Sequence, residues 1–198
     1  VSGWTLAVAK TDDLTYTATY TNNNDNTNTF TKTITLQKSG TDLTSEGKVQ
    51  TYKGDTLTKD FTASDTITVK ATPTATGEAP ANSAMFAASF TGPGAGQMAV
   101  FVGDTQVSAP ADKGADGTYT MTVSAADVLV AAGGPGTGIT LTAKFVGNDN
   151  MADGAGTVDV SISAVAKIEN GSTTTYVGNL DDAFKTENDG ATITLLKD

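Results

Sequence analysis

The sequence is dominated by stretches in which threonine alternates with apolar residues. In LTYTATYT, residues 14–21, the side chains of Leu14, Tyr16, Ala18 and Tyr20 occupy every second position, with threonines between them. Successive side chains of a β-strand point to opposite faces, so this pattern predicts a strand with one apolar and one hydrated face. Threonine suits the hydrated face because its branched Cβ favours an extended backbone and its hydroxyl binds water without adding charge.

The same period of two recurs along the chain. Further strands are predicted within residues 30–36, 65–71, 85–91, 97–102, 117–123, 138–146 and 156–163. Segments rich in Asn, Asp, Gly and Pro separate these stretches and favour turns. Residues 124–133 favour a short turn or a single helical turn that crosses between sheets. Many short strands joined by turns predict an all-β fold, with antiparallel strands packed as a β-sandwich.

Composition excludes several classes of function. The chain has 198 residues with 22 acidic and 12 basic side chains, all of the basic ones Lys, and a net charge of −10. Nucleic acid is therefore not an expected partner, because phosphate binding requires a basic surface. The chain contains no Cys and no His, which excludes a Ser-His-Asp triad, a Cys-His pair and a typical zinc site. It also lacks the run of about 20 apolar residues that a membrane span needs.

Residues from about Asp65 to Ala164 carry a specific order of motifs. These are ITVKATPT, MFAASFTGPGAGQMAVFVGDTQV, GTYTMTVSAADVL and GITLTAKFVGNDNMADGAGTVDVSISA. The stretch resembles a bacterial Ig-like domain of the kind that occurs in tandem along surface proteins. The family's hairpin pattern is matched by Gly96, Met98, Val100, Gly103 and Val107. The resemblance implies an antiparallel Ig-like β-sandwich, which we expect over residues 63–165.

The alternation also predicts which side chains face the core of this sandwich. We expect the inward set to be Met98, Val100, Tyr119, Met121, Val123, Ile139, Leu141, Ala143 and Phe145. Lys144 falls on the outward phase, where we expect it to be solvated.

The segment before this sandwich, residues 1–62, is predicted to be a small N-terminal β module that contains Trp4, or the end of a preceding repeat. Its boundary is placed near Ala63, although the sequence there has no Pro or Gly linker. No repeat of the middle stretch is evident within it.

The last segment, residues 166–198, is predicted to form a strand, a short helix and a strand that begin a further domain. Asn179 is a good N-cap, and Asp181 and Asp182 lie in the first turn, where the helix dipole favours acidic side chains. The segment resembles the entry of right-handed β-helix domains on bacterial surface proteins, with a longer hairpin and with Phe184 at a position where smaller residues are common. We expect a longer protein to continue past Asp198.

The middle stretch and the last segment are expected to differ in whether they fold alone. We expect residues 65–164 to fold alone. Residues 166–198 are expected not to fold alone and to dock on a neighbouring module or on another copy, because an element of this size is marginal in water.

Several residue groups could carry chemistry, and each also has a simpler structural interpretation. Residues 21–28 and 147–156 could supply oxygen ligands to calcium, but Asn and Asp are also ordinary turn residues. Two carboxylate pairs, Asp181–Asp182 and Glu187–Asp189, could act on glycosidic bonds, but they fit a solvated helix face better. A cross-link between a Lys and an Asn or Asp side chain is a third option, for which the sequence identifies no residues. Gly92, Gly94 and Gly96 follow no phosphate-binding pattern.

Aromatic side chains are the remaining candidates for a binding role. Those that could stack on a sugar ring are Trp4, Tyr16, Tyr20, Tyr52 and Tyr176, although core and cross-strand packing explains them more simply. We assign no catalytic, cofactor-binding or metal-binding residue, and we expect no enzyme activity.

The function expected from these patterns is that of a non-catalytic, extracellular scaffold or stalk of a bacterial surface protein, adhesin-like in character. The alternative is a carbohydrate-binding module of a larger glycan-degrading enzyme. Expected partners are a host or bacterial surface glycan or protein, and neighbouring modules of the same protein.

Overall fold

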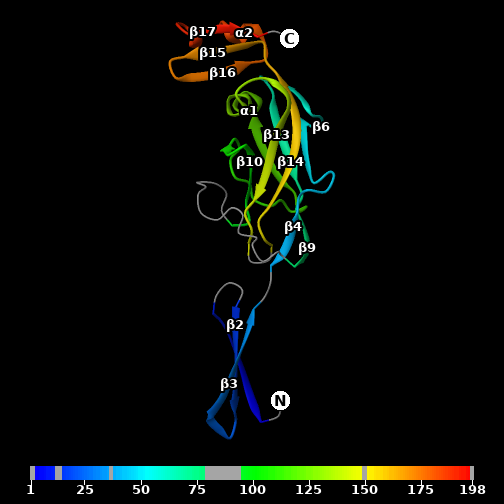
Figure 1. Cartoon of the computed structure of the whole chain (residues 1–198), viewed down its shortest axis with the longest axis vertical. Helices are drawn as coiled ribbons and strands as arrows, with labels where there is room; N and C mark the ends of the chain where they lie inside the picture. Colours follow the sequence, from blue (N-terminus) through cyan, green and yellow to red (C-terminus); the bar gives the residue numbers. More distant parts are fainter. Residues whose placement is uncertain (1–2, 12–14, 36–37, 79–94, 149–150, 197–198) are drawn as a thin grey trace.

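The computed structural model of the chain describes residues 3–11, 15–35, 38–78, 95–148 and 151–196. Strands account for 59% of the structure and helices for 8%, which confirms the prediction of an all-β protein. The strand predicted at 85–91 lies outside the described residues. Figure 1 shows three β units, with β1–β3 at one end, two larger sheets in the middle and β15–β17 at the other end.

The central unit contains two sheets. The strands of the first are, in order, β11 (Thr105–Gln106), β10 (Met98–Val102), β13 (Gly136–Phe145), β14 (Gly154–Ser163) and β7 (Asp60–Thr62). Those of the second are β12 (Tyr119–Ser124), β8 (Thr66–Ala71), β5 (Val49–Lys53) and β6 (Thr56–Leu57). Neighbouring strands are antiparallel except for β7 and β14, which run parallel. A separate pair, β4 (Ser39–Asp42) and β9 (Thr74–Glu78), lies at the end nearest β1–β3 (Figure 1).

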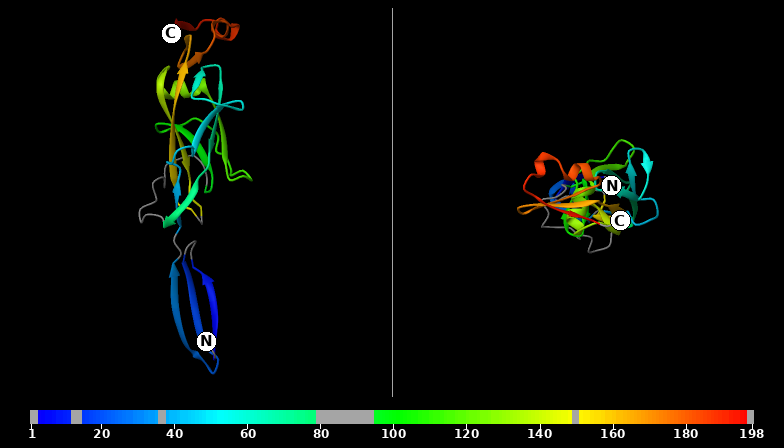
Figure 2. Two further views of the ribbon diagram at one scale, coloured as in Figure 1. Left: turned by 90° about the vertical axis from the view of Figure 1, so that its right-hand side faces the viewer. Right: turned by 90° about the horizontal axis from the view of Figure 1, so that it is seen from above.

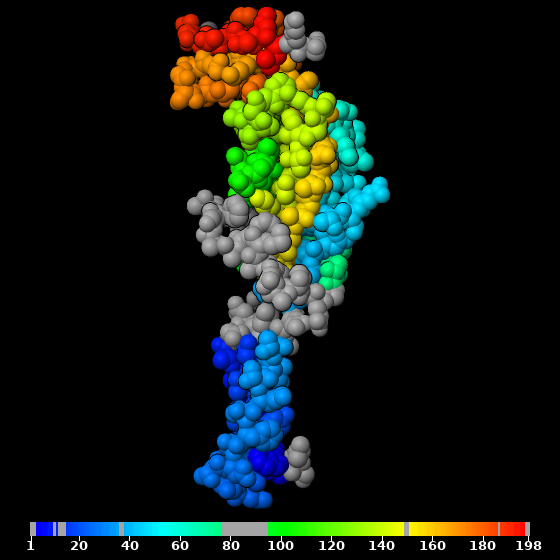
Figure 3. Space-filling model, in the orientation of Figure 1, coloured from blue at the N-terminus to red at the C-terminus, as the bar shows by residue number. Residues whose placement is uncertain are grey.

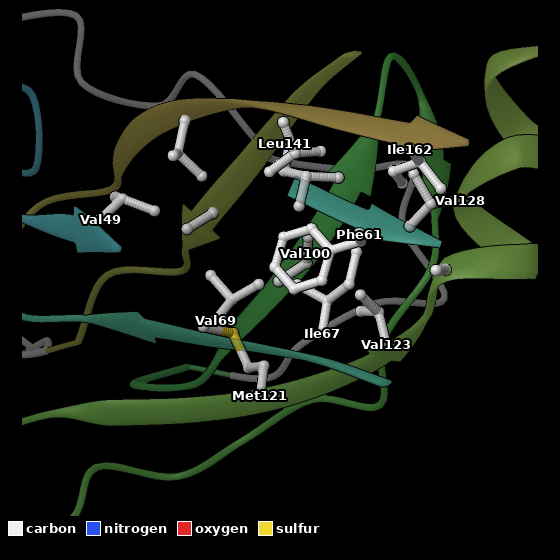
Figure 4. Close-up of a cluster of buried hydrophobic side chains, with 14 of the residues drawn as sticks. Val49, Phe61, Ile67, Val69, Val100, Met121, Val123, Val128, Leu141 and Ile162 are labelled. Atoms are coloured by element: carbon white, nitrogen blue, oxygen red, sulfur yellow. The ribbon is translucent and has the colours of Figure 1, made fainter. Parts of the chain in front are cut away.

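One apolar core lies between these two sheets (Figure 4). The predicted inward residues of β10, β12 and β13 face this core, which confirms the prediction. Ile139 is only partly buried. The buried ones are Met98, Val100, Tyr119, Met121, Val123, Leu141, Ala143 and Phe145. The Nζ of Lys144 lies 4.4 Å from the ring centroid of Phe101, so this outward side chain covers an aromatic ring. The predicted helical turn is an eight-residue helix, α1 (Ala125–Ala132), which places Val128 and Leu129 in the core and ends at Gly133 with a left-handed φ of 83°.

The expected N-terminal module, residues 1–62, differs from the observed packing. Strand β5 lies between β6 and β8, and β7 pairs with β14, so both belong to the central unit. Leu43, Val49 and Phe61 are buried in its core. Residues 39–62 therefore pack with the strands that follow them. Only β1 (Trp4–Lys10), β2 (Thr15–Asn22) and β3 (Asp25–Thr35) form a separate antiparallel sheet, visible as the narrow N-terminal part in Figures 2 and 3.

This N-terminal sheet repeats the register of three central strands. In β1–β2, Leu6, Ala7 and Val8 lie opposite Tyr20, Thr19 and Ala18. In β10–β13, Met98, Ala99 and Val100 lie opposite Phe145, Lys144 and Ala143. The sequences of the two middle strands agree as well, with TYTATY at 15–20 and TLTAKF at 140–145. This likeness is limited to these strands, and the expectation that residues 1–62 hold no repeat of the middle stretch stays a prediction.

The C-terminal unit is a three-stranded sheet in the order β16 (Thr173–Val177), β15 (Ala166–Asn170) and β17 (Thr192–Leu195). Between β16 and β17 lie the short helix α2 (Leu180–Ala183) and the 3-10 turn η1 (Thr186–Asn188). The side chain of Asn179 accepts a hydrogen bond from the Asp182 backbone N–H at 2.9 Å, as predicted for an N-cap.

The C-terminal unit docks on the central unit. Tyr176 is buried in the main core, and the Gly178 N–H donates to the Ser64 hydroxyl at 3.1 Å. That residues 166–198 do not fold alone remains a prediction.

Candidate functional site

Three aromatic side chains gather on one face of the N-terminal sheet. The rings of Tyr20 and Phe30 stack with centroids 4.6 Å apart and an interplanar angle of 5°. The ring of Trp4 meets Phe30 edge-on at 5.8 Å and 67°. These arrangements follow from the register, which places Leu6, Tyr20 and Phe30 side by side on adjacent strands. Phe30 did not stand out in the sequence, because the residues around it, NTNTFTKT, are polar.

The same face carries the apolar positions of all three strands. Leu6, Val8, Phe30 and Ile34 are exposed by 51%, 56%, 53% and 43%, whereas Ala18 in the centre is 2% exposed. We call this surface the aromatic face; it consists of Trp4, Leu6, Val8, Tyr16, Ala18, Tyr20, Phe30 and Ile34. Lys32, opposite Ala18 on the edge strand β3, is a charged residue within it.

The opposite face of this sheet is polar. Thr21 pairs with Thr29, Thr19 with Thr31 and Thr17 with Thr33 across β2 and β3, so their hydroxyls form rows on that side. The predicted division of these strands into an apolar and a threonine face is thus present. Among the described residues, no further layer covers the apolar face.

The other predicted stacking residues are used elsewhere. Tyr52 lies on β5, where its hydroxyl donates to Gln50 and the Nζ of Lys70 lies 4.7 Å from its ring centroid. Tyr176 is 6% exposed and packs in the main core. The structure therefore brings together Trp4, Tyr16 and Tyr20 and adds Phe30, and it places Tyr52 and Tyr176 away from this face.

The Asn- and Asp-rich segment at 21–28 forms hydrogen bonds within its turn. Asp25 Oδ1 accepts from the N–H and the hydroxyl of Thr27, at 3.0 and 2.6 Å, and these bonds lower the pKa of its carboxyl group. Asn22 Oδ1 accepts from the Asn24 N–H at 2.9 Å. These oxygens therefore satisfy the local backbone, as turn residues do.

The segment at 147–156 behaves in the same way in its described part. Asp153 Oδ1 accepts from the Gly147 N–H at 2.7 Å, and Asn148 Oδ1 accepts from the Met151 N–H at 2.9 Å. Strand β14 begins at Gly154, two residues before the strand predicted at 156–163, so Gly154 is a strand residue and not part of the turn. Across the described ranges, no three acidic, His or Cys side chains come together in a way that could hold a metal ion.

The carboxylate pairs at the C-terminal end do not face each other across a cleft. Asp182 pairs with Lys185 at 2.7 Å, and the hydrogen bond from Lys185 lowers the pKa of its carboxyl group despite some desolvation. Asp181, Glu187 and Asp189 are exposed. Their exposure fits the simpler interpretation of these carboxylates, that of a solvated helix face.

A Lys–Asn/Asp cross-link needs a buried acid, and the buried polar side chains in the described part are Thr51 and Ser108.

A groove of about 570 Å³ runs between β5–β6 and β14, and the carboxylates that line it are Glu46 and Asp159. Asp159 accepts from the Thr140 hydroxyl at 2.7 Å. With no His or Cys in the chain, the groove cannot hold a Ser-His or a Cys-His pair.

Comparisons of the chain with protein-family models, with curated proteins and with solved structures each find no match. Within the described ranges, no helix has the length and apolar character needed to cross a bilayer. The aromatic face is thus the surface feature on which a binding function can best be argued.

Proposed function

We propose that this chain is a non-catalytic, extracellular scaffold or stalk of a bacterial surface protein, adhesin-like in character, with its central unit an Ig-like sandwich. The observation that carries the proposal is the serial arrangement of β units together with the repeated register of β1–β2–β3 and β10–β13–β14. Repetition of one sheet pattern along a chain is what tandem modules produce.

The strand order supports the Ig-like part of this proposal. In an Ig-like sandwich of the constant type, strands A, B, E and D form one sheet and strands C, F and G form the other. Here β5, β8 and β12 are neighbours in an order that agrees with A, B and E, and β10, β13 and β14 are neighbours in an order that agrees with C, F and G. The arrangement departs from that type at its edges, where β6 extends the first sheet and β7 joins β14.

Surface chemistry supports an extracellular stalk. The net charge of −10 keeps the chain soluble without favouring nucleic acid, and the strands expose threonine hydroxyls rather than charges. The proposed partners are a host or bacterial surface glycan or protein, and adjoining modules.

The test is localisation of the full-length protein in its source cells. Antibodies raised against residues 39–164 should label intact cells, and protease added outside should remove the label. Signal that appears only after lysis, in the soluble fraction, would overturn the proposal.

A carbohydrate-binding module is the second candidate, and the exposed, stacked ring of Phe30 is the observation that favours it. A glycan array probed with the wild-type chain and with Phe30→Ala separates the two functions. Binding that the variant loses by tenfold or more supports the glycan module. Array signal at background for the wild type eliminates it.

A further inference from the structure

A second surface suited to a partner is the groove between β14 and β5–β6, because one of its walls is the edge of a strand. The main-chain groups of Ser161 and Ser163 point to this edge: the Ser161 N–H donates to the Lys59 carbonyl at 2.7 Å, and the Ser163 carbonyl accepts from the Ala63 N–H at 2.8 Å. Every second residue of a strand directs its N–H and C=O groups to the same side. Thr157 and Asp159 therefore direct theirs to this edge as well.

The pairing of β14 with β13 agrees with this orientation. Asp159 lies opposite Thr140, whose hydroxyl donates to the Asp159 carboxylate at 2.7 Å. Such close side chains are typical of antiparallel pairs that exchange no main-chain hydrogen bonds. The N–H and C=O groups of Thr157 and Asp159 have no hydrogen-bond partner in the part of the chain that the structure describes. We call these two residues the open edge of β14.

Short strands already lie along this edge at both ends of the gap. At one end β4 runs parallel to the residues just before β14, and the Ala152 N–H donates to the Ser39 carbonyl at 2.9 Å. At the other end β7 runs parallel to residues 161–163. Between them, residues 43–59 turn away to form β5 and β6 in the other sheet. The gap opposite residues 155–159 is about 16 Å long, which is the length of one short strand.

The groove beside the open edge has room and apolar contacts for such a strand. Its volume of about 570 Å³ lies within the range of about 300–1,000 Å³ that is typical of ligand sites. Val49 and Val158 are buried at its base, whereas Leu57 is 59% exposed. Every second side chain of an added strand would point towards these residues. The exposed carboxylates of Glu46 and Asp159 favour basic side chains in the same strand.

We propose that the open edge of β14 binds an extended peptide segment of a partner protein, which adds a strand of about five residues between β4 and β7. A peptide fits because its own N–H and C=O groups recur about every 6.6 Å, the repeat of Thr157 and Asp159. A sugar or the side of a helix has no such row of main-chain groups. A second copy of this chain is disfavoured by its net charge of −10, which instead attracts a basic partner.

NMR titration of the isotope-labelled full chain tests the proposal. The probe is a short peptide in which valine and threonine alternate, with a lysine at each end. Its binding should shift the amide signals of Thr157 and Asp159 and slow their hydrogen exchange at least tenfold at saturation. We expect a dissociation constant of about 0.1–1 mM, because few main-chain hydrogen bonds form and the free peptide must be ordered.

Two variants at one position separate main-chain pairing from side-chain contact. Thr157→Pro removes the N–H of the open edge, and should weaken binding at least tenfold. The variant should still fold, because proline is tolerated where the N–H of an edge strand is unpaired. Thr157→Val keeps the N–H and should bind like the wild type. The probe peptide methylated on its backbone nitrogens should not bind the wild-type chain.

Four results would overturn the proposal. The first is the absence of any shift at Thr157 and Asp159 with about 5 mM peptide. The second is equal binding by folded Thr157→Pro and Thr157→Val. The third is equal binding of the plain and the methylated peptide, which decides the matter even if Thr157→Pro does not fold. The fourth is slowed exchange at Thr157 and Asp159 that rises with protein concentration alone, which would assign the edge to a second copy.

Discussion

Gly156 lies where strand β14 passes directly beneath the chain between β4 and β5. A Cβ at this position would overlap the Leu43 carbonyl oxygen and would lie 2.7 Å from Val49 Cγ2. Because a backbone atom cannot move aside cheaply, we expect Gly156→Ala to lower the free energy of unfolding by about 2–4 kcal/mol. Urea unfolding of the full chain measures this change.

Gly136→Ala is the control for that experiment. Gly136 lies on the neighbouring strand β13, has no heavy atom within 4 Å of an added Cβ and needs no left-handed backbone. We expect the free energy of unfolding of Gly136→Ala to remain within about 0.5 kcal/mol of that of the wild type. Equal losses in both variants would show that β14 does not approach the Leu43 backbone so closely.

Asp42 makes the β4 end of the central unit sensitive to strong acid. Its carboxyl group accepts hydrogen bonds from the Ser45 hydroxyl and from the N–H groups of Ser45 and Thr44, and these bonds lower its pKa from 3.8 to about 2. A folded-state pKa below the unfolded one means that the contribution is present above about pH 4 and is lost as the pH falls towards 2. A carbon NMR titration should give an Asp42 midpoint near 2, and a midpoint near 3.8 would contradict these bonds.

At the scale of elements, strict alternation was sufficient to predict β2, β8, β12 and β13, since their apolar residues recur at every second position over five or more residues. It was not sufficient for β7, where Phe61 is the single buried residue of a three-residue strand. Short strands of this kind are defined by their partners rather than by their own pattern. Gly154 is likewise predicted to be part of a turn, although it is a strand residue whose missing side chain allows Thr41 to approach.

Tyr176 is the buried side chain of the C-terminal sheet that packs in the core of the central unit. Tyr176 is buried against the central unit, and the three buried residues of the sheet's own cluster are Ala166, Ile168 and Ala183. Truncating a buried aromatic ring costs about 3–5 kcal/mol. We therefore expect Tyr176→Ala to release the sheet, so that amide exchange at Ile168 and Ile193 accelerates at least a hundredfold while Met121 and Leu141 stay protected.

Tyr52→Ala is the matched variant, because Tyr52 is only half-buried and lies on β5, away from this contact. It should leave exchange at Ile168 unchanged. Unaltered protection of Ile168 in Tyr176→Ala would mean that the C-terminal sheet is stable without docking.

For the whole molecule, the serial order of the β units was predicted, but the limits of the central unit were not. Leu43, Val49 and Phe61 lie before the expected boundary and are part of the core. We therefore expect residues 39–164 to unfold cooperatively when expressed alone. Residues 65–164 should lack a cooperative transition, since they lose β5 and β7 together with those three side chains. Differential scanning calorimetry compares the two, and a sharp transition in the shorter chain would restore the boundary near residue 63.

The aromatic face shows a further limit of prediction at this scale. The alternation in residues 14–21 predicted an apolar face correctly, but nothing local distinguishes a face that its own chain covers from one that it leaves open. TYTATY and TLTAKF read alike, yet only the second has β8 and β12 above it. What covers a strand is a property of the strands elsewhere in the molecule.

The parallel pairing of β7 and β14 has a mechanical consequence. Strand β7 follows β4, β5 and β6, and β14 lies near the exit of the chain from the central unit. The two strands are joined by the hydrogen bonds Ser161 N–H to Lys59 O and Ala63 N–H to Ser163 O, at 2.7 and 2.8 Å. Once β4, β5 and β6 have detached, a pull on the two ends of the protein drags β7 and β14 in opposite directions along their length. The bonds are then strained together in shear, whereas an antiparallel pair pulled at one end would open bond by bond. This edge is where the central unit resists being drawn out.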